Sequence, residues 1–351
     1  MSGITDRARP EILALKAYSH AAWEPQLVRM HANELPVRVD GDPSAAGLNR
    51  YPEPQPPELV RGFAGLCGVD PAQVLVGRGS DEAIDVLVRV FCRAGQDNVI
   101  VCPPTFGMYG VAARIQGADV RTVPLRADAG FDLDVAKILA AVDANTKIVF
   151  VCTPNNPTGN VVPRDVVLDL ARHLAASGTL LCVDEAYLEF GTAPSVAGDV
   201  AAWPNLCVLK TLSKAHGLAG ARCGALVADP AIIALGRKVI PPYAIAEMTV
   251  EIVAPLLAPA GLAAMRGRVA GILAERTRLV EGLRAARGVR KIWPTEANFV
   301  LVDFDDPDDV LRRVRSAGLI IRDVRQPLLP QALRISVGTP EQDDRLLEAL
   351  K

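Results

Sequence analysis

The sequence KIVFVCTPNNPTG (residues 147–159) joins an apolar run to a polar turn. Its first six residues form an apolar run rich in β-branched side chains, which predicts a buried strand, and the Asn-Asn-Pro-Thr-Gly that follows is a turn sequence. A strand with so little polar alternation fits a parallel sheet that is covered by helices on both faces. Polar residues directly after such a strand lie at the edge where open α/β sheets bind their ligands.

Similar apolar runs recur on both sides of this stretch, at residues 73–76, 98–102, 119–123, 179–184, 205–210 and 224–228. Helical patterns with apolar residues at i, i+3, i+4 and i+7 lie between several of these runs, at residues 84–91, 135–142 and 167–174. This alternation of strands with helices predicts an α/β fold with a mostly parallel central sheet flanked by helices.

The C-terminal part differs in composition and in the order of its predicted elements. Residues 261–288 are rich in Ala, Leu, Arg and Glu and predict one long helix. Strands are expected at ANFVLVDF (297–304), LIIRDV (319–324) and LRISV (333–337), with a helix over 307–317 and a last helix that begins at Thr339-Pro340. We therefore expect a large domain over residues 47–257 and a smaller α+β domain that combines residues 1–46 with residues 258–351.

Composition and charge argue against several classes of protein. The 351 residues carry 38 Lys and Arg against 40 Asp and Glu, so we expect no nucleic-acid partner. No stretch of about 20 residues stays apolar, and the N-terminus lacks the apolar core of a secretory signal. We therefore expect no membrane span and predict a cytoplasmic protein. The 7 cysteines form no C-x-x-C pair, which favours free thiols and argues against a metal site.

The segment GRGSDE (77–82) lies between a predicted strand and an amphipathic helix. It lacks the third glycine of the dinucleotide fingerprint, and the chain contains neither a G-x-x-x-x-G-K-[ST] nor a G-x-S-x-G motif. The backbone N–H groups of Ser80 and Asp81 would open the helix, and such a helix terminus binds phosphate. Taken alone, the segment is more simply an ordinary turn with Ser80 as the helix N-cap.

Further polar clusters follow three of the predicted strands, namely NNPTG (155–159), DEAY (184–187) and TLSK (211–214), and Arg222 comes eight residues after the lysine. Each cluster has a simpler explanation on its own: a turn, a helix cap, a core tyrosine or a solvated surface amine. The carboxyl ends of parallel strands meet at one edge of a sheet, however, so the ordered combination indicates a single ligand site there.

This ordered set resembles the fold-type I pyridoxal-phosphate enzymes, specifically the class I/II aminotransferases, over essentially the full length of the chain. Within them the sequence is most similar to the histidinol-phosphate aminotransferases. The segments that carry this closer similarity are NRYP (49–52), RGSDE (78–82), CPPTFGMY (102–109), TLSKA (211–215), GLAG (217–220), RCG (222–224), EANF (296–299) and LRISVGT (333–339).

The resemblance implies pyridoxal 5′-phosphate as the cofactor, with Lys214, Asp184 and Tyr187 as catalytic residues. Lys214 would bind the cofactor covalently and then act as the proton shuttle, while Asp184 would keep the pyridine nitrogen protonated. Asn156 and Tyr187 would donate to the phenolic oxygen, and Phe106 would stack on the ring. The phosphate would be held by the N–H groups of Ser80 and Asp81, the hydroxyls of Thr211 and Ser213, and Arg222.

The resemblance also implies a homodimer with shared active sites, in which Tyr51 of one subunit reaches the cofactor phosphate in the other. Arg334 matches the arginine that grips the anionic end of the substrate. Arg322 would be a second clamp, although a surface residue beside a strand also fits it. Two guanidinium groups suit a phosphate dianion, while one is enough for a carboxylate. The other expected substrate contacts are Tyr18, Tyr243 and Asn156, and for Tyr243 a purely structural role is equally open.

The function that this resemblance implies is transamination of L-histidinol phosphate, a phosphorylated amino alcohol, with 2-oxoglutarate as acceptor. The products would be imidazole-acetol phosphate and glutamate, in histidine biosynthesis. An aromatic amino-acid aminotransferase or a threonine-phosphate decarboxylase is the alternative, because pocket shape decides which bond of the substrate breaks. A binding module on the same fold would be expected to lose Lys214 or Asp184, and both residues are present.

Overall fold

The computed structural model describes residues 3–20, 24 and 26–351. Its large sheet consists of β1 (Val74–Gly77), β2 (Asn98–Val101), β3 (Asp119–Thr122), β4 (Thr146–Cys152), β5 (Leu180–Asp184), β6 (Leu206–Thr211) and β7 (Gly224–Val227). The 7 strands are ordered β1-β7-β6-β5-β4-β2-β3. All neighbours from β6 to β3 are parallel, whereas β7 runs antiparallel to both β6 and β1. The predicted mostly parallel α/β sheet is therefore confirmed.

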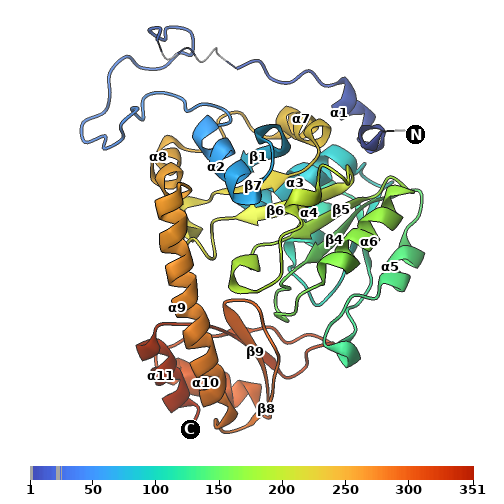
Figure 1. The fold of residues 1–351 in the computed structure, drawn as a ribbon, viewed down its shortest axis with the longest axis vertical. Helices are drawn as coiled ribbons and strands as arrows, with labels where there is room; N and C mark the ends of the chain where they lie inside the picture. The colour runs from blue at the N-terminus through green and yellow to red at the C-terminus, as the bar shows by residue number, and fades with distance from the viewer. Residues whose placement is uncertain (1–2, 21–23, 25) are drawn as a thin grey trace.

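Helices cover both faces of this sheet (Figure 1). One face packs against α3 (Ser80–Phe91), α4 (Met108–Gln116) and α7 (Pro230–Val239), and the other packs against α5 (Val135–Ala141) and α6 (Arg164–Ala175). Along β4, Ile148 and Phe150 face the first group of helices, while Val149 and Val151 face the second. Burial on both sides explains why the strand reads as one continuous apolar run. Beside β1 and β7 lie α2 (Pro57–Cys67) and α8 (Glu247–Leu256).

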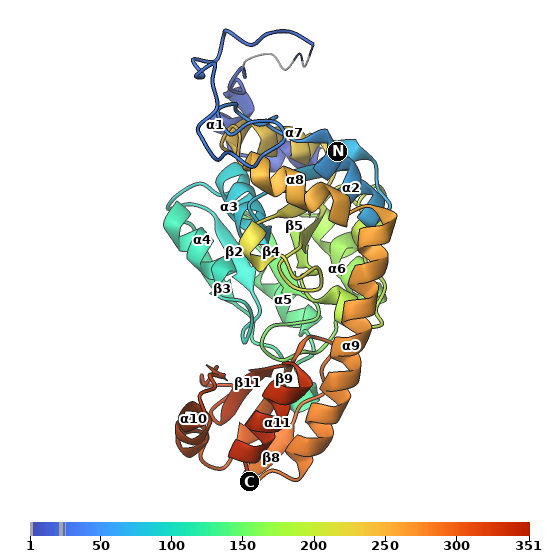
Figure 2. The ribbon, with the colours of Figure 1, turned by 90° about the vertical axis from the view of Figure 1, so that its left-hand side faces the viewer.

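The C-terminal unit contains a smaller antiparallel sheet. Its strands are β8 (Val289–Ile292), β9 (Phe299–Phe304), β10 (Arg322–Asp323) and β11 (Ala332–Ser336), in the order β10-β11-β9-β8. The helices of this unit are α9 (Pro259–Arg284), α10 (Pro307–Ser316) and α11 (Pro340–Ala349). The long helix α9 runs from α8 along the side of the molecule to the small sheet (Figures 1 and 2). The expected domain boundary after residue 257 falls between α8 and α9.

The N-terminal segment lies at the opposite end of the molecule from the small sheet (Figures 1 and 2). A 3-10 turn (Ile4–Arg7) and α1 (Pro10–Ala14) pack against α7. The described part of residues 15–50 contains neither helix nor strand and forms an extended arm. The division expected from the sequence groups residues 1–46 with the C-terminal unit, whereas the structure places residues 4–14 beside the large sheet.

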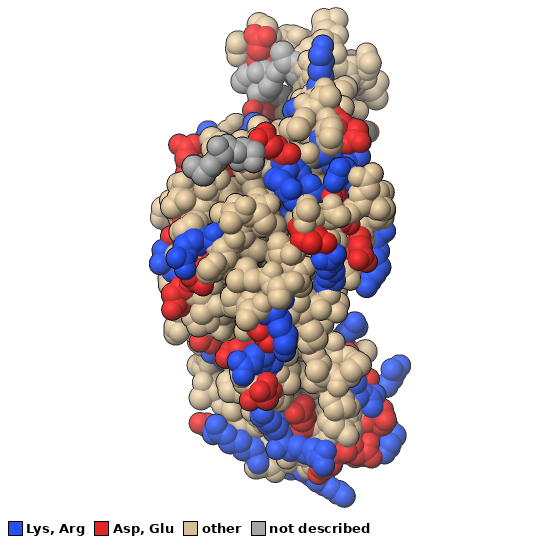
Figure 3. Space-filling model, turned by 90° about the vertical axis from the view of Figure 1, so that its right-hand side faces the viewer, with Lys and Arg blue, Asp and Glu red and all other residues tan. Residues whose placement is uncertain are grey.

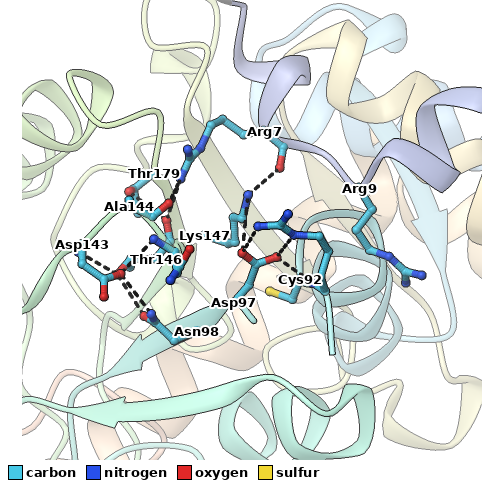
Figure 4. A network of polar contacts seen from close by, with 12 residues as sticks. Arg7, Arg9, Cys92, Asp97, Asn98, Asp143, Ala144, Thr146, Lys147 and Thr179 are labelled. Atoms are coloured by element: carbon cyan, nitrogen blue, oxygen red, sulfur yellow. Dashed lines mark hydrogen bonds and ion pairs between the residues drawn. The ribbon is translucent and has the colours of Figure 1, made fainter. Parts of the chain in front are cut away.

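A polar network anchors this segment to the amino ends of β2 and β4 (Figure 4). The Arg7 guanidinium donates to the Ala144 carbonyl at 2.9 Å, and Lys147 Nζ donates to the Arg7 carbonyl at 3.1 Å. Lys147 Nζ also lies 3.8 Å from Asp97 Oδ1, and Asp97 accepts two hydrogen bonds of 2.8 Å from Arg93. Because Asp97 and Lys147 are buried, this pairing fixes the position from which the arm leaves the large sheet.

Basic and acidic side chains are interspersed over the face of the molecule shown in Figure 3. In the described part of the chain, no single helix is long and apolar enough to cross a membrane. The helices α8 and α9 meet that length and composition only as a pair, and they are bent by 77° relative to each other. Within the same residues, no group of three or more His, Cys, Asp or Glu side chains is placed to hold a metal ion.

Candidate active site

A cavity of about 140 Å³ lies at the carboxyl edge of the large sheet. The strands β4, β5 and β6 end there, and polar residues at or just beyond these ends line the cavity, among them Asn156, Asp184 and Lys214. Ten of the residues expected to bind the cofactor line this one cavity: Ser80, Asp81, Phe106, Asn156, Asp184, Tyr187, Thr211, Ser213, Lys214 and Arg222.

Asp184 is the last residue of β5 and is only 3% exposed. Its Oδ2 accepts a hydrogen bond from the Tyr109 hydroxyl at 2.8 Å, and its Oδ1 accepts one from the Ala186 backbone N–H at 3.1 Å. Burial raises the pKa of Asp184 to about 6, while these two hydrogen bonds act in the opposite direction. Asp184 forms no ion pair with any other described residue, so its carboxylate is available to a cationic ring nitrogen.

Lys214 lies three residues beyond the end of β6 and is partly buried. Its Nζ is 5.5 Å from the centroid of the Tyr187 ring, which in turn packs edge-on against Phe299 at 5.2 Å. Burial lowers the pKa of Lys214, and the positive charge of Arg334 lowers it further. A lowered pKa leaves more of the amine unprotonated near neutral pH, which is the form that acts as a nucleophile or base.

The amino end of α3 forms another part of the cavity wall. Ser80 is the first residue of this helix, and the N-cap is Gly79, which has φ 88° and makes no side-chain cap. The simpler alternative, with Ser80 as N-cap, is therefore wrong. A Cβ atom on Gly79 would lie 3.0 Å from a nitrogen of Arg222, so this position favours glycine both for its positive φ and for its closeness to the guanidinium.

Arg222 completes a set of groups that suits a phosphate. Its guanidinium lies 3.2 Å from Asp81 Oδ2 and 3.4 Å from Ser213 Oγ, and Ser213 Oγ also accepts a hydrogen bond from Thr211 Oγ1 at 3.0 Å. Two hydroxyls, a guanidinium and the free N–H groups of a helix terminus are the donors that hold phosphate groups in proteins. The donor set therefore fits a phosphorylated cofactor whose ring extends towards Asp184.

Arg334 of β11 reaches from the small sheet to this cavity. Its Nη1 donates to Asn156 Oδ1, and its guanidinium carbon lies 5.1 Å from the centroid of the Phe299 ring. Arg322 of β10 is directly opposite Arg334 in the antiparallel register, and both line a groove of about 720 Å³ beside α10. Burial lowers the pKa of Arg334, and the charge of Arg322 acts in the same direction. Neither arginine forms an ion pair with another described residue.

The three expected tyrosines Tyr18, Tyr51 and Tyr243 line neither this cavity nor the groove of the two arginines. Tyr51 stacks on Tyr243 with 4.5 Å between ring centroids, and both Tyr243 and Tyr18 lie 5.4 Å from His20. Tyr18 and Tyr51 belong to the N-terminal arm, and both are exposed. A single chain therefore gathers these three tyrosines in a separate aromatic cluster.

Two residues near the cavity have no role in the expectations from the sequence. Cys152 lines the cavity, and Tyr109 donates to the Asp184 carboxylate. The local signal for Tyr109 is weak, because it is the second residue of α4 whereas Phe106 precedes this helix, so helical spacing does not relate the two side chains. The partner of its hydroxyl lies 75 residues away in the chain and is not evident from local spacing.

Comparisons with known proteins agree with this geometry. Residues 32–350 match the family described as aminotransferase class I and II. The chain is 45% identical to a histidinol-phosphate aminotransferase from Stenotrophomonas maltophilia, over 97% of this chain and 95% of that protein. It is 41% identical to one from Escherichia coli O9:H4 (strain HS), over 99% and 98% of the two chains.

A solved structure shares the same architecture. The histidinol-phosphate aminotransferase from Sinorhizobium meliloti, in complex with pyridoxal-5′-phosphate, superimposes with a TM-score of 0.78 at 27% identity, covering 86% of this chain and 82% of that one. The family match, the near-full-length relatives and the cavity residues lead to one conclusion: the chain belongs to the class I and II aminotransferases, a family that depends on pyridoxal phosphate.

Proposed function

We propose that this protein catalyses the transamination of L-histidinol phosphate, with 2-oxoglutarate as the amino acceptor, to give imidazole-acetol phosphate and glutamate in histidine biosynthesis. One observation carries the proposal: a buried carboxylate and an amine of lowered pKa line one cavity, and Arg334, which bonds to Asn156 at that cavity, lies opposite Arg322 in the adjoining groove. The names of the near-full-length relatives support the same substrate. A cytoplasmic location stays a prediction.

The cavity residues divide into groups that would hold the cofactor. The phosphate would bind the amino end of α3, the hydroxyls of Thr211 and Ser213, and Arg222. Phe106 would face the ring, and Asn156 and Tyr187 would donate to its phenolic oxygen. Asp184 would pair with the pyridine nitrogen. When bound there, pyridoxal phosphate withdraws electrons from the substrate carbon that carries the amino group.

Lys214 would carry the two remaining tasks. Its Nζ would bond to the cofactor in the resting enzyme, and substrate would then free the amine. The freed amine would take the proton from the substrate carbon next to nitrogen. The lowered pKa of Lys214 supports both tasks, because each requires the unprotonated amine.

Arg334 and Arg322 would bind the substrate phosphate. Like charges placed directly opposite each other on neighbouring strands destabilise a sheet unless an anion lies between them. A phosphate dianion matches two guanidinium groups, whereas an amino-acid carboxylate needs only one. The pair therefore favours a phosphorylated substrate over an aromatic amino acid.

We expect kcat/KM for L-histidinol phosphate to exceed that for phenylalanine by at least about 100-fold, because the second guanidinium contributes to binding only when a dianion is present. O-phosphothreonine should give no decarboxylation product. Side-by-side steady-state assays with 2-oxoglutarate as acceptor measure all three substrates. A higher value for phenylalanine would identify an aromatic amino-acid aminotransferase, and release of carbon dioxide from O-phosphothreonine would identify a decarboxylase.

We also infer that the protein is a homodimer with shared active sites. The extended arm exposes a series of large apolar side chains: Leu27, Val28, Met30, Leu35, Val37 and Val39. Such a series in one segment is typical of an interface with another chain. Glu34 accepts hydrogen bonds from the Tyr51 backbone N–H at 2.7 Å and from Arg50 at 3.0 Å, so Tyr51 is held in place although it lies outside its own cavity. This arrangement supports a role for Tyr51 in the cavity of a second copy.

Mixing Lys214→Ala with an impaired Tyr51→Ala variant tests the shared site. In a hybrid of Lys214→Ala with Tyr51→Ala, one of the two sites would contain both native residues, because each site takes Lys214 from one subunit and Tyr51 from the other. We expect the hybrid dimer to regain about half of the wild-type kcat. Light scattering checks the mass of the hybrid. A dimer with no regained activity would mean that Tyr51 serves the cavity of its own chain, and a fully active Tyr51→Ala homodimer would mean that it serves neither cavity.

A further inference from the structure

The Asp184 carboxylate is held from behind by a side chain that does not line the cavity. The Tyr109 hydroxyl donates to Asp184 Oδ2 at 2.8 Å, and Tyr109 is completely buried. On the other oxygen, Oδ1, the Ala186 N–H donates at 3.1 Å. Two donors, one on each oxygen, define the plane of the carboxylate before any ligand binds.

The Tyr109 ring has little freedom to move away. It stacks on Phe150 of β4 with 4.9 Å between ring centroids and an interplanar angle of 5°. The edge of the Phe106 ring meets it at 5.6 Å and 82°. Phe106 itself lines the cavity, so the aromatic side chains connect the expected cofactor plane to the hydroxyl that binds Asp184. Burial raises the pKa of Tyr109 well above its ordinary value, so the hydroxyl keeps its proton and acts as a donor.

The charged and titratable groups around Asp184 determine how much the Tyr109 hydroxyl affects the ionisation of its carboxyl group. Besides Tyr109, the titratable groups that interact with Asp184 are Asp81 of α3, Cys152 of β4, Cys182 of β5, Glu185 and Tyr187 after β5, and Lys214 after β6. Burial and the negative charges of Asp81 and Glu185 disfavour the ionised carboxylate, and the hydroxyl of Tyr109 is the strongest influence that favours it. Lys214 is the one cation in this group.

We propose that Tyr109 is a positioning residue for Asp184: its hydroxyl fixes the orientation of the carboxylate and keeps it in the ionised form that retains the protonated pyridine nitrogen of the cofactor. The inference rests on the proposed function, because it takes Asp184 as the partner of that nitrogen. Tyr109 does not line the cavity, so in this role it acts through Asp184.

The sign of the pH effect follows from the direction of each influence. Loss of the hydroxyl removes an influence that lowers the pKa of Asp184, so in Tyr109→Phe this pKa rises above its wild-type value of about 6. Below its pKa the carboxyl group is neutral and cannot pair with a cationic ring nitrogen. As the pH is lowered, affinity for the cofactor should therefore begin to fall at a higher pH in the variant than in the wild type.

The test measures binding of pyridoxal phosphate to the full-length protein after the bound cofactor has been removed. Equilibrium dissociation constants are determined by fluorescence between about pH 5 and about pH 8, a window that spans the pKa of Asp184. For Tyr109→Phe we expect binding about tenfold weaker at neutral pH and a midpoint shifted to higher pH. In the holoenzyme, kcat should fall more than KM changes, because the ionised carboxylate supports the reaction rather than substrate binding.

Two further variants separate this role from packing. Phe150→Leu removes the stacking partner of Tyr109 but leaves the hydroxyl–carboxylate bond, so it should lower the melting temperature without moving the pH midpoint. In an Asp184→Asn background, Tyr109→Phe should have no further effect on cofactor affinity, because no carboxylate remains for the hydroxyl to influence.

The outcomes are distinguishable. If the wild type fails to bind pyridoxal phosphate, the proposed function itself is wrong. If the wild type binds while Tyr109→Phe shows the same affinity and the same midpoint, the positioning role is overturned. A midpoint shift of equal size in Phe150→Leu, or an undiminished effect of Tyr109→Phe beside Asp184→Asn, would also overturn it, because either result assigns the effect to packing.

Discussion

Lys214→Ala is expected to reduce transamination below detection and to prevent covalent attachment of the cofactor. The same amine bonds to the cofactor and takes the proton from the substrate carbon, so one substitution removes both. Steady-state assays with L-histidinol phosphate measure the first effect. Borohydride reduction followed by mass spectrometry of the intact protein measures the second, because reduction makes a lysine-bound cofactor permanent.

The expected effect is large because no neighbouring amine can replace Lys214. Lys210, four residues earlier, is 5% exposed and lies 2.7 Å from Glu185 and 3.6 Å from Glu189. Burial alone would lower the pKa of Lys210, but the two carboxylates outweigh it and raise this pKa above its ordinary value. Lys210 therefore stays protonated and cannot act as a nucleophile or base. Lys214 has no equally close carboxylate, so burial lowers its pKa.

A matched control is Lys137→Ala. Lys137 lies on α5, its side chain is exposed, and it pairs with Asp134 at 2.9 Å. Exposed pairs of this kind contribute little to stability, so turnover and cofactor attachment should both be retained. Turnover and a reduced adduct in Lys214→Ala would reject the mechanism.

The ten cavity residues could be predicted from the sequence because each belongs to a motif next to a strand or to a helix start. The expected runs at 119–123 and 205–210 correspond to β3 (Asp119–Thr122) and β6 (Leu206–Thr211), and the carboxyl ends of such strands meet at one edge. The small sheet was less predictable. Of the expected strand at 319–324, only Arg322–Asp323 forms β10, an edge strand with a single neighbour, and Ile320 is 84% exposed.

The positions of the arm and of Tyr109 depend on contacts that are distant in the chain. Tyr51 stacks on Tyr243, and Arg7 bonds to residues near the start of β4, so local periodicity contains no information about either. From the sequence alone Tyr109 is expected to be an ordinary core aromatic residue, because only the packing of α4 beside β5 brings its hydroxyl to Asp184. A buried hydroxyl needs a hydrogen-bond partner, and the structure identifies it as the Asp184 carboxylate.

Arg334→Ala is expected to lower kcat/KM for L-histidinol phosphate by roughly 30- to 1,000-fold, on the order of 2–4 kcal/mol, because an anion would be left without its partly buried partner. Arg325→Ala is the matched control. Arg325 already pairs with Asp323 at 2.7 Å and with Asp308 at 2.8 Å, so its loss removes no free cation from the groove. A near-native kcat/KM for Arg334→Ala would show that the substrate anion is held elsewhere.

Arg322→Ala separates a phosphate site from a carboxylate site. Arg322 is more exposed than Arg334, so the loss for L-histidinol phosphate should be smaller than for Arg334→Ala, about tenfold. For phenylalanine, whose carboxylate needs only one guanidinium, the same substitution should leave kcat/KM unchanged. The relief of repulsion between opposed arginines should also stabilise the small sheet slightly, so a lost activity cannot be attributed to unfolding. An equal loss for both substrates would mean that Arg322 acts on the fold of the groove and not on the phosphate.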